Sequence, residues 1–201
     1  MISRTLLDKY YIRERRSVSE ISRMCKVSQG SINYWLAKYS IKKRSIRDAV
    51  YQKWNPNGDP FKIKPPNSLE EAFLYGLGVG LYWGEGTKRS KTSVRIGNSD
   101  PRLLRMFIEF LVVCYRIDKK RLRCGLQVFG DMNKAAVERF WMKELGFPKS
   151  HFYKTIVTPY RGVGNYRHKT KNGVATIYFN NRKLRDILCD VIGQLPMRKP
   201  R

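Results

Sequence analysis

A single carboxylate, Glu85, stands at the end of an apolar segment in which glycine recurs every fourth residue. The recurring glycines are Gly76, Gly80 and Gly84, and the segment ends at Gly86. Residues 73–86 otherwise have the composition of a short apolar helix, and each glycine inside a helix costs about 1 kcal/mol relative to alanine. Residues four apart lie on one face of a helix. The spacing therefore predicts a face on which a second backbone can approach closely.

The predicted position of Glu85 is electrostatically unfavourable, because the C-terminal end of a helix carries partial negative charge. A close helix contact combined with an acid at this end predicts a paired-helix site with a cation between two carboxylates. The alternative is an exposed ion pair of Glu85 with Lys88 or Arg89, which would contribute only about 0–1 kcal/mol.

The chain is strongly basic. Its 201 residues include 41 Lys and Arg but only 16 Asp and Glu, which gives a formal net charge of +25. Such an excess predicts a polyanionic partner, either nucleic acid or, less readily, an anionic membrane surface. With 42% hydrophobic and 12% aromatic residues, the chain has the composition of folded domains rather than of a disordered basic tail.

The composition also argues against several classes of protein. The four cysteines form no Cys-x-x-Cys pair, and with only His151 and His168 beside them they predict no zinc finger. Scattered thiols and the absence of a signal peptide favour a cytoplasmic, nucleoid-associated protein. The apolar run at 73–83 is shorter than the roughly 20 residues of a membrane span. We expect no membrane partner and no small-molecule substrate.

Residues 1–54 predict a small all-α DNA-binding domain. Ser17 and Glu20 have the spacing of a capping box, and the segment 17–39 resembles the compact helix-turn-helix domains of resolvases and regulators. That family most often has glycine at the position of Lys26, in the turn. The alternative is a three-helix packing module that does not bind DNA.

The second helix of this motif, expected at 29–39, would be the recognition helix. If Ile32 and Leu36 face inward, then Gln29 and Asn33 face outward, and amides of this kind can read adenine edges. We expect the DNA-binding residues of this domain to be Gln29, Ser31, Asn33, Tyr34, Lys38, Lys42, Lys43 and Arg44.

A short basic helix is expected at 42–54. The prolines and the Asn-Gly pair between 55 and 67 break regular structure, which predicts a linker there. The linker either follows a DNA backbone or is merely solvated. The second domain is expected at 68–195, beginning with a capping box at Ser68–Glu71, and a basic tail at 196–201 follows.

Helices and strands alternate in the second domain, which predicts an α+β fold. Besides the glycine-containing helix, helices are expected at 101–115, 133–145 and 182–192. Strands are expected at 92–98, 122–129, 152–158 and 174–180.

The segment Gly78-Val-Gly-Leu-Tyr-Trp-Gly-Glu-Gly86 resembles the signature of the LAGLIDADG family of homing endonucleases and their relatives. Gly80 and Gly84 fall on the small residues of that motif, Gly86 on its last glycine and Glu85 on its final, metal-holding acid. Trp83 replaces the other acid, so the match is incomplete. The resemblance extends over about residues 68–195.

The resemblance implies a LAGLIDADG-type mixed α/β domain with an antiparallel DNA-binding sheet. With one motif per chain, it implies a homodimer whose seam is Gly76, Gly80 and Gly84, and a roughly palindromic double-stranded DNA target. Glu85 and Gly84 of the two copies would hold Mg²⁺ or Mn²⁺, which assists phosphodiester hydrolysis.

Basic and polar residues would also stabilise the charge that develops on the phosphate. The candidate catalytic residues are Glu85, Lys88, Gln127 and Lys154. The candidate DNA-binding residues of this domain are Arg89, Lys91, Arg95, Arg161, Tyr166, Arg167, Lys169 and Lys171. For the loop that contains the last five of these, the alternative is a solvated segment without a ligand.

The sequence is compatible with three functions. A homodimeric homing-type endonuclease is favoured by the acid at position 85. A non-cleaving transcriptional regulator with a degenerate LAGLIDADG domain fits the helix-turn-helix motif equally well. An RNA-binding or splicing factor is the third, because some relatives serve as intron maturases.

Overall fold

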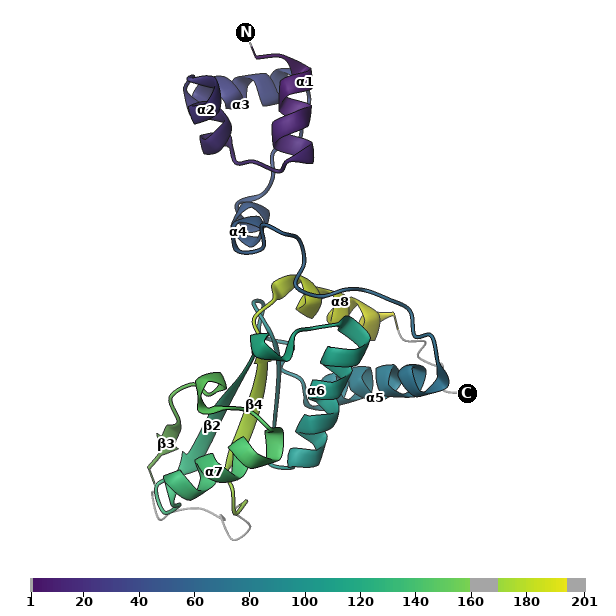
Figure 1. The fold of residues 1–201 in the computed structure, drawn as a ribbon, viewed down its shortest axis with the longest axis vertical. Coiled ribbons are helices and arrows are strands. Elements are labelled where there is room, and N and C mark those ends of the chain that lie inside the picture. The colour runs from purple at the N-terminus through teal and green to yellow at the C-terminus, as the bar shows by residue number, and fades with distance from the viewer. Residues whose placement is uncertain (1, 160–169, 195–201) are drawn as a thin grey trace. The chain divides into compact units, whose positions relative to one another are not determined.

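The structure is a computed structural model that describes residues 2–159 and 170–194 (Figure 1). The chain divides into two compact units, Met1–Asp59 and Pro60–Arg201, and each has its own hydrophobic core. The division lies inside the expected linker. Phe61, directly after it, is buried in the core of the second unit, and the Lys62 amide donates to the Tyr115 carbonyl at 2.8 Å. Part of the proline-rich segment is therefore attached to the second unit.

The first unit contains only helices. Its elements are α1 (Arg4–Leu7), which continues as the π-helical segment η1 (Asp8–Arg13), α2 (Val18–Cys25), α3 (Gln29–Lys38) and α4 (Ile46–Trp54). The core consists mainly of Leu7, Ile21, Ile32 and Leu36.

The predicted boundary signals of the helix-turn-helix motif are confirmed. The Glu20 amide donates to Ser17 Oγ at 3.2 Å, and the Ser17 amide donates to Glu20 Oε2 at 2.8 Å, which completes the capping box. Lys26 ends α2 in the left-handed conformation, with φ of 51°. A left-handed lysine is less favourable than glycine, but the geometry of the turn is retained.

The second unit is α+β. Its principal elements are α5 (Leu69–Glu85), β1 (Val94–Asn98), α6 (Pro101–Tyr115), β2 (Leu122–Phe129), α7 (Lys134–Leu145), β3 (Ile156–Thr158), β4 (Val174–Phe179) and α8 (Arg182–Gly193). Two short 3₁₀ turns, η2 (Lys119–Arg121) and η3 (Lys149–His151), connect them. The expected capping box at Ser68 is only half formed, because the Glu71 carboxylate accepts from the Asn67 amide instead of the Ser68 amide.

The four strands form one sheet in the order β1-β4-β2-β3. The β1–β4 and β4–β2 pairs are antiparallel, whereas β3 runs parallel to β2. The predicted antiparallel sheet is therefore a mixed sheet, in which only the β2–β3 pair is parallel. The reason is the connection: β2 and β3 are joined through α7, and a helical crossover of this kind joins parallel strands.

The strand expected at 152–158 is shortened to Ile156–Thr158. Thr155 is buried and donates its hydroxyl to the Glu138 carboxylate of α7. Phe152 makes only an isolated bridge to Cys124. Lys154, expected on a strand, therefore lies in the segment that precedes β3.

Helices cover one face of the sheet. Alternate strand residues such as Ile96, Cys124 and Ile177 are fully buried on this face, and α5 and α6 lie to one side of β2 and β4 (Figure 1). Helix α5 packs closely on α6, because a Cβ at Gly78 would lie only 2.1 Å from the ring of Phe110. The other sheet face carries polar and basic residues, described below.

Candidate functional site

The glycines of α5 divide into two kinds according to what surrounds them. At Gly76, Gly80 and Gly84, which we call the glycine face, a Cβ would meet no atom of the described chain within 4 Å. At Gly78 and Gly86 a Cβ would overlap Phe110 and Tyr82. The fold of a single chain therefore requires Gly78 and Gly86, but it gives no reason for the glycine face.

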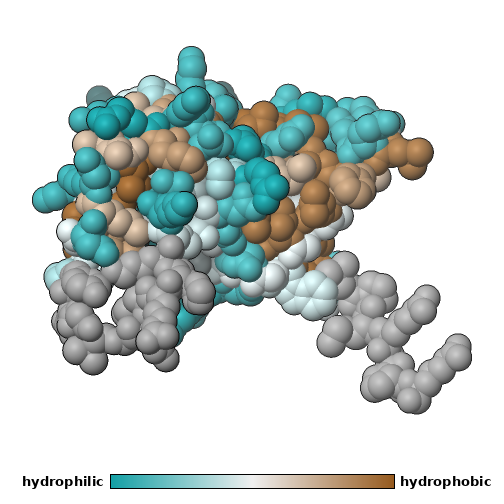
Figure 2. All heavy atoms as spheres, turned by 90° about the horizontal axis from the view of Figure 1, so that it is seen from below, coloured by the Kyte–Doolittle hydropathy of each residue, from teal (hydrophilic) through white to brown (hydrophobic). Residues whose placement is uncertain are grey.

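Large apolar side chains extend along the same side of α5. At about 100° per residue, Leu69 and Phe73 lie on the side of the helix that bears the glycine face. Leu69 is 85% exposed and Phe73 71% exposed, and Trp83 is also exposed. Figure 2 shows hydrophobic surface on the side of the second unit where α5 lies. The part of this side from Gly76 to Gly84, which has no side chains at three positions, has the shape of a helix-pairing surface. Leu69 and Phe73 lie in the turns before it.

Glu85 is the last residue of α5, and its side chain is exposed. Among the described residues, none forms an ion pair with it. Lys88, the expected alternative partner, donates its ammonium to the Trp83 carbonyl instead. The lysine therefore offsets the negative end of the helix and leaves the Glu85 carboxylate without a counter-ion in the described part of the chain.

One chain offers few ligands for a metal at this point. Within the described residues no group of three or more His, Cys, Asp or Glu side chains is placed to hold a metal ion. Magnesium in nucleotide-processing sites is commonly bound through one or two carboxylates, with phosphate oxygens and water as the other ligands. Glu85, together with the backbone carbonyl of Gly84, supplies half of such a set, so the residues fit Mg²⁺ only if a second copy contributes the other half.

The sheet continues from β1 to the end of α5. The Thr87 amide donates to the Arg95 carbonyl at 2.9 Å, and Gly86 forms an antiparallel bridge with Ile96. Gly86 has φ of −72°, so glycine is required there by contact with Tyr82 rather than by a left-handed turn. Glu85 therefore lies at the β1 edge of the sheet.

The sheet face that is not covered by helices, which we call the open face, presents two cations around one aromatic ring. Arg95 on β1 and Arg123 on β2 are both cross-strand partners of Tyr178 on β4. The Arg95 guanidinium lies over the Tyr178 ring, 5.2 Å from its centre, and Arg95 Nε donates to Ser93 Oγ at 2.6 Å. Arg95 is therefore held by the ring and the hydroxyl, and the Arg123 guanidinium is held by the carbonyls of Lys120 and Leu122, to which it donates at 2.7 and 2.8 Å.

In the next row of the open face, two of the three residues are glycines, so few side chains project from the sheet there. Gly97 and Gly125 flank Thr176, and a Cβ at these glycines would come within 2.9 Å of the Thr176 hydroxyl and 3.1 Å of the Tyr178 ring. Exposed Gln127 follows on β2 and donates to Thr158 Oγ1 at 3.0 Å. The open face is thus a shallow surface of arginine, tyrosine, threonine and glutamine, a composition suited to phosphate and base contacts.

The candidate catalytic residues do not meet in one chain. Lys88 is close to Glu85 in sequence, but Gln127 lies on β2, separated from β1 by β4. Lys154 precedes β3, beyond β2. The structure therefore brings Lys88, Arg89, Lys91 and Arg95 to the Glu85 edge, and it does not bring Gln127 and Lys154 there.

Helix α3 presents most of the expected recognition residues. Gln29, Tyr34 and Lys38 are exposed, and the Lys38 ammonium lies 4.8 Å from the centre of the Trp35 ring. Ser31 is half-buried. Asn33, expected to face outward, is half-buried, and its side-chain oxygen is buried with no hydrogen-bond partner among the residues that the structure describes.

Arg44 has a structural position, and its assignment as a DNA contact needs correction. Its guanidinium donates to the carbonyls of Arg15 and Arg16 and to the Gln52 side chain, and lies 4.3 Å from the centre of the Tyr11 ring. Its amide donates to the Tyr11 hydroxyl at 2.8 Å. Arg44 therefore attaches α4 to the helix-turn-helix unit, whereas Lys42 and Lys43 are exposed.

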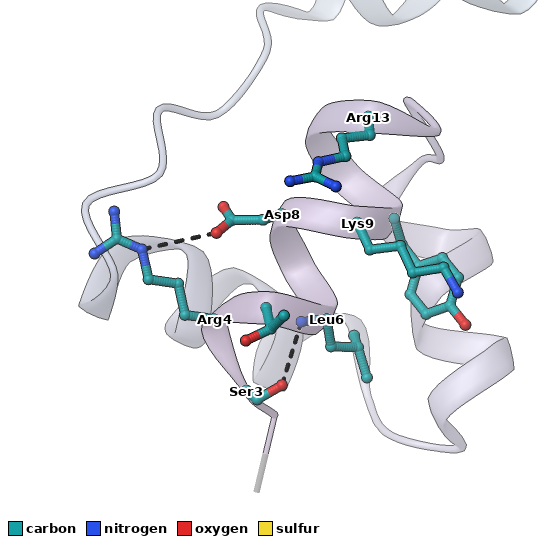
Figure 3. Close-up of a pocket in the computed structure, with 8 residues that line it drawn as sticks. Ser3, Arg4, Leu6, Asp8, Lys9 and Arg13 are labelled. Carbon is teal, nitrogen blue, oxygen red and sulfur yellow. Dashed lines mark hydrogen bonds and ion pairs between the residues drawn. The ribbon is translucent and has the colours of Figure 1, made fainter.

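Further basic surface lies on the first helix, around a shallow hollow of the first unit (Figure 3). Arg4 Nε lies 3.9 Å from the Asp8 carboxylate, so these two residues form an ion pair at the rim of the hollow. Lys9 and Arg13 are the other cations that line the hollow. The sequence patterns did not single out these residues.

Four of the expected DNA-binding residues, Arg161, Tyr166, Arg167 and Lys169, lie outside the described residues. Lys171 is described and exposed. Sequence reasoning missed Arg123 and Tyr178. Their signal was available, because both alternate with buried residues along their strands, as Arg95 does along β1.

Comparison with protein-family models, with curated proteins and with solved structures finds no match for this chain. In the described parts of the chain, no helix combines the length and the apolar character that crossing a membrane requires.

Proposed function

We propose that this chain binds specific sites on double-stranded DNA as a homodimer and hydrolyses phosphodiester bonds there with a divalent metal, in the manner of homing-type endonucleases. The observation that carries the proposal is the end of α5: an exposed glycine face leads to a carboxylate that has no counter-ion among the described residues.

DNA binding is supported by both units. The net charge of +25 favours association with a polyanion. In the first unit, exposed Gln29 and Tyr34 lie on the second helix of a helix-turn-helix motif. In the second unit, Arg95, Arg123 and Tyr178 form a row on the open face.

Dimerisation would complete the acidic centre. Pairing of two glycine faces would bring the Gly84-Glu85 ends of two chains together, and Glu85 with the Gly84 carbonyl of each copy would hold Mg²⁺ or Mn²⁺. Such a metal, when bound, activates water and stabilises the leaving oxygen. Arg95 and Lys91 bind the DNA backbone beside the centre, and Lys88 keeps the helix end neutralised while leaving the Glu85 carboxylate available.

A non-cleaving DNA-binding regulator is the second candidate. It is favoured by Trp83, which stands where the LAGLIDADG motif has its other acid, and by the separation of Gln127 and Lys154 from Glu85. Both candidates share the DNA surface and the dimer, and they differ in whether phosphodiester bonds are broken.

Cleavage of DNA libraries in Mg²⁺ or Mn²⁺, with binding followed in parallel, tests the proposal. The wild type should cut a site that it binds, and Glu85→Gln should bind the same site but not cut it. Asp190→Asn, which removes an exposed acid from α8, is the matched control and should cut normally. Tight binding to a defined site without nicking in any divalent metal would establish the regulator instead.

A further inference from the structure

Helix α4 carries an apolar stripe that its own unit leaves uncovered. Ile46, Val50 and Trp54 follow one another at intervals of four residues, and they are 85%, 50% and 77% exposed. The opposite side of the helix is the attached side, because Gln52 accepts from Arg44 and donates to the Arg15 carbonyl. The stripe therefore faces away from the unit to which α4 is bound.

Cations border this stripe on both sides. At about 100° per residue, Lys53 lies on one side of Ile46 and Val50, and Arg47 lies on the other side. Both are exposed. The outward surface of α4 is thus a basic amphipathic helix about two turns long, a form that binds in apolar grooves.

An apolar groove with an acidic border lies between α5 and α6 of the second unit. It has a volume of about 510 Å³, and its apolar lining includes Leu69, Phe73, Met106 and Val113. Its remaining lining includes Glu70, Glu71 and Glu109, and no cation contributes to it. Three acids at one groove are unusual in a chain with only 16 Asp and Glu against 41 Lys and Arg.

Two of these acids have no ion-pair partner among the described residues. Glu71 pairs with Arg116 at 3.3 Å, whereas Glu70 and Glu109 form no ion pair with a described residue. An acidic border repels DNA and attracts a basic helix, so the groove is unsuited to the partner that the rest of the surface favours.

We propose that this groove binds helix α4 of a second copy of this chain, with the Ile46–Val50–Trp54 stripe against Phe73 and Val113 and with Arg47 and Lys53 toward the glutamates. Complementary charge favours a helix of this basic chain, in a second copy, over DNA as the occupant. Occupation by α4 of the same chain is an outcome of the test below. The contact needs neither DNA nor metal and does not rest on the proposed function.

Disulfide trapping between two full-length copies tests this contact. One tagged copy carries Val50→Cys and a differently tagged copy carries Phe73→Cys, both in a background in which the native cysteines are replaced by serine or alanine. After mild oxidation without DNA, we expect a covalent species that contains both tags. Asp48→Cys, on the attached side of α4, replaces Val50→Cys in the control and should trap at least tenfold less. Equal trapping in the control, or no trapping, would overturn the proposal.

Two further measurements separate the alternatives. If the double variant Val50→Cys/Phe73→Cys forms only an internal disulfide, α4 of the same chain occupies the groove and the proposal is wrong. If α4 instead binds DNA, Trp54 fluorescence will change on addition of DNA while no copy-to-copy trapping occurs, which also overturns the proposal.

A charge exchange gives independent support: Glu109→Lys should reduce trapping, and Lys53→Glu in the other copy should restore it. Gly80→Leu tests the glycine face separately, so failure of either contact is distinguishable.

Discussion

The Arg95 guanidinium lies over the ring of Tyr178, 5.2 Å from its centre, and the same tyrosine has Arg123 as its cross-strand partner on the other side. A tyrosine between two arginines on an open sheet face forms a rigid cationic row. The Arg123 guanidinium also donates to the carbonyls of Lys120 and Leu122, so the stability of Arg123 variants must be measured beside their binding.

If the chain binds DNA as proposed, Arg95→Gln and Arg123→Gln should each weaken binding, because each removes a cation that is proposed to contact phosphate. We expect the slope of log K against log salt to fall by about 1 for each substitution. Arg139→Gln, on the exposed surface of α7, has the same change in charge and should leave the slope nearly unchanged. Fluorescence anisotropy over a salt series measures this, and equal slopes for all three variants would remove the open face from the interface.

Replacement by alanine should have opposite effects on the free energy of unfolding at the two kinds of glycine in α5. Gly78→Ala should lower the free energy of unfolding by about 1–3 kcal/mol, because the added methyl overlaps the Phe110 ring. Gly76→Ala meets no atom of the described chain, and it should raise the helix stability by up to about 1 kcal/mol. Urea unfolding at low protein concentration separates them, and similar losses for both variants would show that the glycine face is packed within one chain.

Arg44 and Lys42 should separate stability from binding. Arg44→Gln removes the charged donor to the Arg15 and Arg16 carbonyls, and the first unit should lose about 1.5–3 kcal/mol. Lys42→Gln should stay within about 0.5 kcal/mol of the wild type but bind DNA more weakly. Thermal unfolding and anisotropy together test this pair. A DNA-binding defect in Arg44→Gln without loss of stability would return Arg44 to the interface.

His151 should make the second unit less stable in mild acid. The ring is buried against Phe147, its Nδ1 has no described hydrogen-bond partner, and burial, with Arg123 and Lys119 nearby, lowers its pKa. The unfolded chain therefore binds a proton at about pH 6.5, before the folded chain does. Stability should be complete above this pH and should fall as the pH decreases from about 6.5 toward the lower folded pKa.

Urea midpoints measured from pH 8 to pH 5 follow this loss, and His151→Phe should flatten the profile over the interval. If the urea midpoint of the wild type stayed constant or rose as the pH decreased from 7 to 5, the assignment of a neutral, buried His151 would be wrong.

Local signals predicted the helices well. Ser17 with Glu20, and Asp100 followed by Pro101, fix the starts of α2 and α6 through short-range hydrogen bonds and backbone restriction, and α6 has the expected bounds. The open face could have been predicted more fully, because Arg123 and Tyr178 follow the same period-two alternation that identified Arg95.

Features that depend on contacts distant in sequence were less accessible. Thr155 leaves the strand because Glu138 of α7 accepts its hydroxyl, and this contact is absent from any strand pattern. Arg44 resembles its neighbours Lys42 and Lys43 in sequence, and only the carbonyls of residues 15 and 16 give it a different role. Likewise, the spacing of Gly76 and Gly78 does not reveal which of them meets Phe110.

The central claim is that two copies of α5 pair through the glycine face and bring their Glu85 residues together. The most direct measurement is self-crosslinking of Glu85→Cys, in a background without native cysteines, compared with Arg139→Cys on the exposed surface of α7. We expect Glu85→Cys to form a disulfide-linked dimer at least tenfold faster, and Gly80→Leu in the same chain to abolish the difference. Equal rates for the two cysteines, or an unchanged rate with Gly80→Leu, would contradict the account.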